Sequence, residues 1–236
     1  MKLPVIFAGH GSPMIALEDN ELTKEFQKIG ERVVSEFEKP KAILSFSAHW
    51  FTRGTYVQSD PEPRQVYDMY GFPKELYEVQ YHPKGCQELT DDILALLPDI
   101  SINDDWGIDH GTWTVLVHMF PGAPIPVVQL SIDGIEGPQS AYDIGKALAP
   151  LREKGYLLLG SGNIVHNLRR LEWDNPNGSP QADRFDAAYA APTADHFLPL
   201  LYTLGAAQGE KPEIFNNVRN TGSLSMTGYL FGFGEK

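Results

Sequence analysis

The sequence predicts a single α/β domain with a central, mostly parallel sheet flanked by helices. Short, continuously apolar runs alternate with stretches of helical periodicity along the 236 residues, which is typical of strands buried between helices. No repeat, low-complexity tract or linker breaks this pattern, so residues 1–236 are expected to form one domain. A chain of this length buries roughly 70–75% of its unfolded surface, enough for a core without disulfides.

The elements are predicted in chain order from periodicity and from cap and breaker residues. The helix over 21–37 is the clearest, because apolar side chains recur at helical spacing behind the cap candidates Asp19 and Asn20, and Pro40 ends it. The stretch 60–83 is rich in Pro and Tyr and lacks periodicity, so it is predicted to be a long ordered loop. Strands are expected at 5–8, 42–46, 125–132, 156–159 and 223–231, and further helices at 91–97, 141–153 and 195–204.

Composition excludes several classes of function. The chain has 31 acidic and 19 basic residues, a formal net charge of −12, and such a surface repels a polyphosphate backbone, so nucleic acid is not an expected partner. No apolar run approaches the roughly 18 residues of a membrane span, and residues 1–4 begin a strand rather than a signal peptide. We therefore expect a cytoplasmic protein. The single cysteine, Cys86, excludes a disulfide framework and a cysteine zinc site.

The positions of the histidines carry the strongest functional signal. His10 and His49 each follow an apolar strand, and His166 follows another after a glycine-containing turn. Because the carboxyl ends of parallel strands meet at one edge of a sheet, we expect these three to converge, with His10 and His49 as metal ligands and the role of His166 open. His110 lies between two tryptophans and beside glycines, which makes it a candidate site residue, whereas the pattern leaves His196 undecided. His82 and His118 are predicted to be structural.

Other chemistries find little support in the residues. The sequence has neither a Walker A loop nor a G-x-G-x-x-G fingerprint, and residues 9–12 lack the spacing of a nucleophile elbow. The glycines at 160 and 162 fit a tight turn better than an anion site. Histidines without thiolates suit zinc, iron, nickel or copper. The residues alone therefore predict a histidine-ligated metal enzyme without choosing the metal.

Five sequence blocks also occur in a characteristic order. They are Phe7-Ala8-Gly9-His10-Gly11-Ser12-Pro13-Met14, Ser47-Ala48-His49-Trp50, Trp106-Gly107-Ile108-Asp109-His110-Gly111-Thr112-Trp113, Val127-Val128-Gln129-Leu130-Ser131 and Gly160-Ser161-Gly162-Asn163-Ile164-Val165-His166-Asn167-Leu168. With the later block at 192–200, they resemble the class III extradiol ring-cleavage dioxygenases of the LigB superfamily, in the branch similar to DOPA 4,5-dioxygenase. The resemblance covers nearly the whole chain.

This resemblance implies a catalytic domain that binds one non-haem metal at the carboxyl ends of the strands. It implies His10, His49 and His196 as metal ligands, and His166 as the acid/base residue or as a fourth contact when zinc is bound. His110 would line the pocket and touch substrate or oxygen. The implied cofactor is Fe(II), with Zn(II) as a metal the purified protein could carry, and the implied reaction opens the ring of a small catechol with O2 to give a semialdehyde.

Alternatives remain open at this point. A zinc-dependent hydrolase uses similar histidines and a water, and a binding protein could keep the fold without turnover. Relatives of this branch carry a longer segment where this chain has only 186–191, which indicates either a shortened lid or a disordered stretch that the sequence omits. A monomer or small homo-oligomer is the expected assembly. Several aromatic residues could line the pocket or pack in the core: Trp50, Phe51, Tyr67, Tyr70, Phe72 and Trp113.

Overall fold

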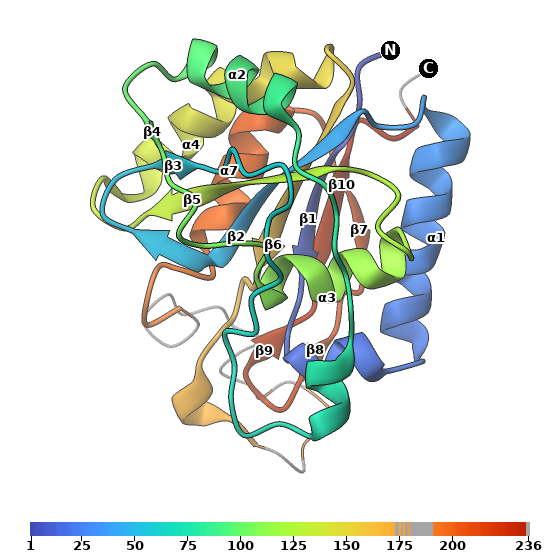
Figure 1. Cartoon of the computed structure of the whole chain (residues 1–236). Coiled ribbons are helices and arrows are strands. Elements are labelled where there is room, and N and C mark those ends of the chain that lie inside the picture. Colours follow the sequence, from blue (N-terminus) through green and yellow to red (C-terminus); the bar gives the residue numbers. More distant parts are fainter. Residues whose placement is uncertain (173–174, 176, 178, 180–190, 235–236) are drawn as a thin grey trace.

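The computed structural model describes residues 1–172, 175, 177, 179 and 191–234. Its main feature is an eight-stranded sheet in the order β4-β3-β5-β2-β6-β1-β10-β7, shown in Figure 1. These strands are β1 (Val5–Gly9), β2 (Ala42–Thr52), β3 (Tyr56–Val57), β4 (Ser101–Ile102), β5 (Val127–Asp133), β6 (Tyr156–Gly162), β7 (Glu213–Phe215) and β10 (Gly228–Phe231). The central strands β5, β2, β6 and β1 are parallel, whereas β10 and β7 add antiparallel strands at one edge. The predicted α/β class is therefore confirmed.

Helices cover both faces of this sheet (Figure 1). The helices are α1 (Glu21–Glu36), α2 (Gln87–Leu96), α3 (His110–Met119), α4 (Gly137–Leu148) and α7 (Leu198–Ala207). Short 3-10 helices are η1 (Pro13–Leu17), η2 (Lys74–Glu78), η3 (Ala149–Arg152) and η4 (Leu168–Arg170). Helices α1 and α3 pack on one face, and α2, α4 and α7 pack on the other, so the domain has three layers and two apolar cores.

The central strands are largely apolar because each of their faces is covered. On β6, Leu157 and Leu159 face the core under α1 and α3, whereas Leu158 faces the core under α4 and α7. Alternation along a strand sends successive side chains to opposite faces. On the second face, α4 and α7 approach closely at Gly145, where an added Cβ would lie 2.0 Å from the carbonyl oxygen of Tyr202.

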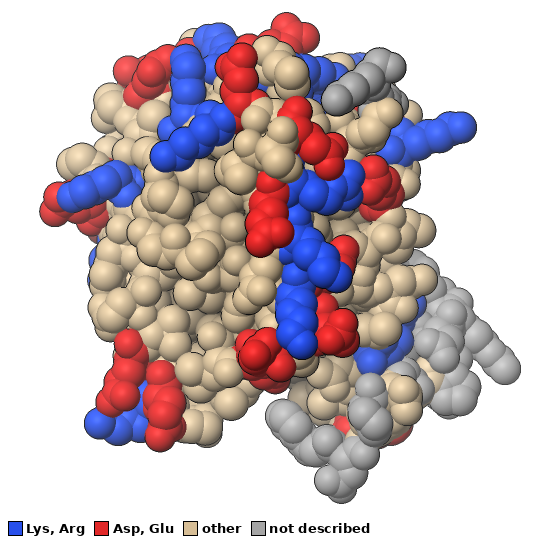
Figure 2. Space-filling model, turned by 90° about the vertical axis from the view of Figure 1, so that its right-hand side faces the viewer, with Lys and Arg blue, Asp and Glu red and all other residues tan. Residues whose placement is uncertain are grey.

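The outer surface of α1 carries charges of both signs. Figure 2 shows the molecule from the side of α1, where basic and acidic side chains lie next to one another. Three pairs along the helix are Lys24 with Glu21, Lys28 with Glu25 and Arg32 with Glu36. The apolar residues of α1 at helical spacing face the core, as predicted. Among the described residues, no helix has both the length and the apolar character that crossing a bilayer requires.

Several predicted boundaries were wrong. No helix is predicted where α3 forms, the helix predicted at 195–204 begins at Leu198, and β2 continues to Thr52 instead of ending before His49. The last predicted strand is two short strands, β10 and β9 (Leu224–Ser225), and β9 pairs with β8 (Arg219–Asn220) in a separate small sheet. The predicted helix 141–153 is α4, which begins at Gly137, followed by η3. Tertiary contacts override local propensity at such ends.

Candidate metal centre

Three histidines converge at the carboxyl ends of the central strands. His10 directly follows β1, His49 lies near the end of β2, and His196 lies two residues before α7. One ring nitrogen from each lies within 4.8 Å of the others, and the Nε2 atoms of His10 and His49 are 3.3 Å apart. All three are largely buried. The structure thus brings together the two histidines expected from strand ends and the one that the pattern left undecided.

Local backbone features place two of these side chains. Between Phe46 and Phe51 the pairing of β2 with β5 is irregular, because this span of β2 lies opposite only Leu130 to Ile132. Such a bulge re-aims side chains beside a site, and His49 lies in it. His196 approaches β6 through its carbonyl, which accepts from the Asn163 amide at 2.9 Å. An added Cβ at Gly162 would lie 2.3 Å from that carbonyl oxygen, so glycine permits the approach.

The Nδ1 atom of each of these histidines is held by a protein oxygen. The partners are Ser161 Oγ at 2.8 Å from His10, Asp68 Oδ2 at 3.0 Å from His49 and Asp195 Oδ2 at 2.8 Å from His196. The Ser161 hydroxyl donates to the carbonyl of Gly111, so its oxygen accepts from the Nδ1–H of His10. This pattern leaves the Nε2 lone pairs free, as in metal sites where a second partner fixes the ligand tautomer.

One buried atom supports metal binding directly. His196 Nε2 is buried and has no hydrogen-bond partner within the described part of the chain. A buried polar nitrogen without a partner costs free energy of about 1–3 kcal/mol, and a metal ion would supply the missing partner. The donor set of three imidazoles fits zinc, iron or copper. Three protein ligands also leave coordination positions open, as in catalytic sites.

The surroundings keep two of these rings neutral. Burial and the neighbouring histidines hold the pKa of His10 well below its ordinary value of 6.5. Burial lowers the pKa of His196 to about 4, although Asp195 opposes the shift. Burial also disfavours protonation of His49, but its hydrogen bond with Asp68 and the nearby carboxylates outweigh burial and raise its pKa. A neutral imidazole with a free lone pair is the form that binds a metal.

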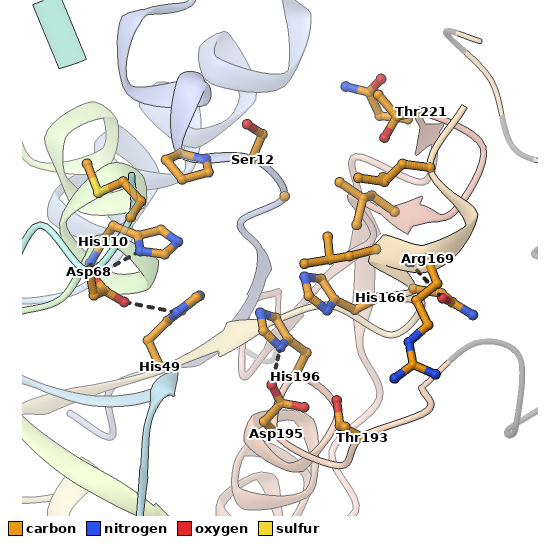
Figure 3. Close-up of a pocket in the computed structure, with 18 of the residues that line it drawn as sticks. Ser12, His49, Asp68, His110, His166, Arg169, Thr193, Asp195, His196 and Thr221 are labelled. Carbon is orange, nitrogen blue, oxygen red and sulfur yellow. Dashed lines mark hydrogen bonds and ion pairs between the residues drawn. The ribbon is translucent and has the colours of Figure 1, made fainter. Parts of the chain in front are cut away.

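A cavity of about 560 Å³ opens beside the cluster, and two further histidines line it, as Figure 3 shows. His110 begins α3, its Nδ1 lies 2.9 Å from Asp68 Oδ1, and its ring centroid is 3.8 Å from that of His49. His166 follows β6, and its ring lies parallel to the ring of His196 with centroids 3.4 Å apart. Burial lowers the pKa of His166 to about 3.

A buried carboxylate fixes the start of α3. Asp109 caps the helix and accepts hydrogen bonds from Ser47 Oγ at 2.6 Å, from Trp106 Nε1 at 3.0 Å and from the Gln129 amide. These donors come from β2, β5 and the segment before α3. The unusual sequence between the tryptophans is therefore a helix start tied to the sheet, and it carries His110 to the cavity.

The remaining predicted residues lie elsewhere. His82 is exposed and contacts Gln80, and His118 binds the carbonyl of Ile15 at 2.8 Å, so neither lines the cavity. Of the six aromatic candidates, Phe72 lines the cavity, whereas Trp113 is in the core. Sequence reasoning missed Asp68 and Asp195. Asp195 directly precedes a histidine, which is a weak signal, but Asp68 lies in the stretch 60–83 without any local signal.

Comparison with known proteins places this geometry in a family. The family model for the catalytic LigB subunit of aromatic ring-opening dioxygenase matches residues 4–189. The chain belongs to this family. A 4,5-DOPA dioxygenase extradiol of Escherichia coli strain K12 is 39% identical over 262 residues, covering 98% of this chain and 95% of the relative. A 4,5-DOPA dioxygenase extradiol of Beta vulgaris is 34% identical and covers 95% of each chain.

A solved structure agrees with the fold. The crystal structure of an uncharacterised protein from Escherichia coli K12 superposes with a TM-score of 0.83 at 36% identity, covering 98% of this chain and all of the other. The LigB-family protein described here is therefore an oxidoreductase of the extradiol dioxygenase type, with a histidine cluster suited to a metal and chemistry on a small aromatic substrate with O2.

Chain length separates this protein from its relatives. The comparison with the Escherichia coli relative runs over 262 positions, whereas this chain has 236 residues, so that relative has segments without a counterpart here. The shortening expected at 186–191 lies outside the described residues except for Ala191. It therefore stays a prediction from the sequence.

Proposed function

We propose that this protein is an Fe(II)-dependent extradiol dioxygenase that opens the ring of a catechol with O2, so that both oxygen atoms enter a semialdehyde product. The observation that carries the proposal is that one ring nitrogen from each of His10, His49 and His196 lies within 4.8 Å of the others, beside a cavity of about 560 Å³. Bound Fe(II) would lower the pKa of the catechol hydroxyls and hold both reactants in one place. Three neutral ligands would leave the site positive enough to favour a dianionic catecholate.

His166 is the residue best suited to move protons. Its ring is neutral, because burial lowers its pKa to about 3, so a ring nitrogen can accept a proton from a catechol hydroxyl. An anionic catecholate beside it raises that pKa, so the proton is retained until it is needed to assist O–O cleavage. The ring of His166 stacks on the ring of His196 with centroids 3.4 Å apart, so His166 lies beside the residues that would hold a metal and could move a proton there or supply a fourth nitrogen contact.

His110 is suited to orient the substrate. Its Nδ1 faces Asp68, and its other ring nitrogen turns toward the cavity, as Figure 3 shows. Burial and the neighbouring His49 lower the pKa of His110 against the opposing effect of Asp68. The neutral ring can therefore accept a hydrogen bond from a catechol hydroxyl or touch O2.

The far end of the cavity supports a substrate with an anionic substituent. Arg169 lines the cavity, and its guanidinium forms no ion pair or hydrogen bond with the residues that the structure describes. We expect Arg169→Gln to raise KM for a carboxylated catechol such as DOPA by about 5–10-fold, while KM for unsubstituted catechol changes less than twofold. Equal effects on both substrates, measured by steady-state kinetics, would remove Arg169 from recognition.

Oxygen uptake tests the proposal. The protein is reconstituted anaerobically with Fe(II) and then given air-saturated buffer with DOPA or catechol. We expect a yellow ring-opened product with stoichiometric loss of O2. In His166→Ala, turnover should fall by about 10²–10⁴-fold, the usual contribution of general acid–base catalysis, while bound iron is unchanged. No uptake with several catechols, together with tight zinc binding, would favour the hydrolase alternative.

A further inference from the structure

We propose that Asp68 is a positioning residue that orients two histidines at once, the metal ligand His49 and the substrate-facing His110. The inference rests on the proposed function for the roles of the two histidines. The geometry itself is independent of those roles. Asp68 Oδ2 lies 3.0 Å from His49 Nδ1, and Asp68 Oδ1 lies 2.9 Å from His110 Nδ1. In Figure 3 the carboxylate faces both rings and both contacts are drawn.

The shared carboxylate favours the same tautomer in both rings. An ionised carboxylate accepts hydrogen bonds and cannot donate them. Because the Nδ1 atoms of His49 and His110 lie 3.0 and 2.9 Å from the carboxylate oxygens, a proton on Nδ1 is favoured in both rings, which leaves a lone pair on each Nε2 atom. For His49 that lone pair serves the metal, and for His110 it serves the cavity.

The position of Asp68 is itself well fixed. Its Oδ1 also accepts from the backbone amide of His110 at 3.0 Å. Two residues earlier, Val66 donates its backbone amide to Ile108 at 2.9 Å and accepts from Trp113 Nε1 at 3.0 Å. The loop is thus tied to both sides of the start of α3. The side chain of Asp68 is 12% exposed, so water competes little for its oxygens.

The other two ligand histidines have separate partners, which provides a matched control. Asp195 contacts the ring of His196 and Ser161 contacts the ring of His10. Loss of the Asp195 carboxylate should therefore affect one ligand, whereas loss of the Asp68 carboxylate should affect one ligand and His110 together. Loss of a hydrogen-bond partner of a metal ligand typically lowers metal affinity by about 10–100-fold.

The experiment measures zinc affinity and histidine tautomers in three variants, with circular dichroism to verify folding. Zn(II) affinity is obtained by competition with a chelator, and ring tautomers by ¹⁵N NMR of the zinc-loaded and metal-free protein. In Asp68→Ala we expect zinc affinity to fall about 10–100-fold and His110 to lose its protonated-Nδ1 signature. In Asp195→Ala we expect a similar loss of affinity with an unchanged His110 signal.

Asp68→Asn gives the sharpest result. The amide offers one acceptor and one donor in place of two acceptors, so one of the two histidines must move its proton to Nε2 while the other keeps it on Nδ1. If His49 switches, zinc affinity falls; if His110 switches, its ¹⁵N signature changes while zinc affinity is kept. Either result supports the shared role.

Two outcomes would overturn the inference. One is wild-type zinc affinity with an unchanged His110 tautomer in Asp68→Ala. The other is binding of two zinc ions by the wild-type protein and one by Asp68→Ala, since Asp68 would then be a ligand of a second metal. None of these measurements uses catechol, iron or O2, so failure of the proposed reaction would leave them interpretable.

Discussion

Strands β1 and β6 have a buried polar cluster at each end, and the two clusters differ in how fully their hydrogen bonds are satisfied. At the amino ends, Arg152 is 1% exposed and every guanidinium nitrogen has a partner. Nε donates to the Leu3 carbonyl at 2.7 Å, Nη1 to the Ala206 carbonyl at 3.1 Å, and Nη1 and Nη2 to Glu210 at 3.0 and 2.7 Å. This cluster joins β1, β6 and α7.

At the carboxyl ends of the same strands, the histidine rings have hydrogen-bond partners at Nδ1, but in the portion of the chain that the structure describes not every Nε2 atom has one. His10 and His196 have Nδ1 partners, but the Nε2 atom of His196 has none among the described residues. Buried polar groups in folded proteins are usually hydrogen-bonded, so an exception calls for a ligand or a functional reason. Of these two clusters, the fully hydrogen-bonded one joins structural elements, whereas the one with an unpartnered buried nitrogen lies beside the cavity.

The largest expected effect is the loss of metal on His196→Ala. Removing one of three ligands should raise the zinc Kd by about 10²–10⁴-fold, roughly a third of the binding free energy of a zinc site. The metal-free protein should stay folded, because Asp195 is 26% exposed and water can replace its lost partner. Chelator competition and circular dichroism measure the two quantities. Unchanged zinc affinity would remove His196 from the site.

Arg152→Ala should lower the free energy of unfolding and leave zinc affinity unchanged, which is the opposite of His196→Ala. It leaves Glu210 and two carbonyls without their main donor, and breaking a buried ion pair typically costs about 3–5 kcal/mol of unfolding free energy. Zinc affinity should be unchanged because the proposed metal site lies at the other end of the strands. Urea unfolding measures the loss.

Lys2→Met provides the control for Arg152→Ala. Lys2 binds the same carboxylate at 2.6 Å but its side chain is 38% exposed, and exposed pairs contribute about 0–1 kcal/mol. If Lys2→Met and Arg152→Ala lose the same free energy of unfolding, the buried and fully hydrogen-bonded Arg152 contributes no more than the exposed Lys2. That result would contradict the structural role given to this cluster.

The two clusters should also differ in how the free energy of unfolding of the metal-free protein depends on pH, although this effect is smaller than those of the substitutions above. The pKa values of His10, His166 and His196 lie below 6.5 in the folded protein, at about 3 for His166 and about 4 for His196. The unfolded chain therefore binds protons first, and stability falls as pH drops below 6.5. Between pH 7.5 and 5.5 we expect a loss on the order of 2–3 kcal/mol, because His49, whose pKa is raised, opposes it.

Glu210 contributes to the pH dependence of stability at lower pH than the histidines do. Its pKa lies below the ordinary value of 4.5, because its hydrogen bonds with Arg152 and Lys2 outweigh burial. Its contribution is present above pH 4.5 and is lost as pH falls through the lowered folded-state value. Urea unfolding in EDTA at several pH values should show a smaller slope between pH 7.5 and 5.5 for His166→Gln and an unchanged slope for Glu210→Gln. A flat wild-type profile would contradict the neutral histidines.

The buried strands could be predicted from the sequence, whereas the start of α3 and the antiparallel edge of the sheet could not. The buried strands were predictable because an apolar run is a local pattern. The position of their ends was also predictable, because the carboxyl ends of parallel strands lie at the same edge of a sheet. The helix α3 was not, because what fixes its start is a set of donors to Asp109 from β2, β5 and the segment before it. The antiparallel edge formed by β10 and β7 also depends on long-range pairing.

The sequence by itself determined the α/β class, the central strands and the placement of His10 and His49 at their ends, since these follow from hydrophobic periodicity and strand direction. Only the tertiary structure decided that Asp68 faces both His49 and His110, that His166 stacks on His196, and that a ring nitrogen from each of His10, His49 and His196 lies within 4.8 Å of the others. The physical reason is that these relations depend on a few ångströms between residues far apart in the chain, and no local pattern encodes such distances.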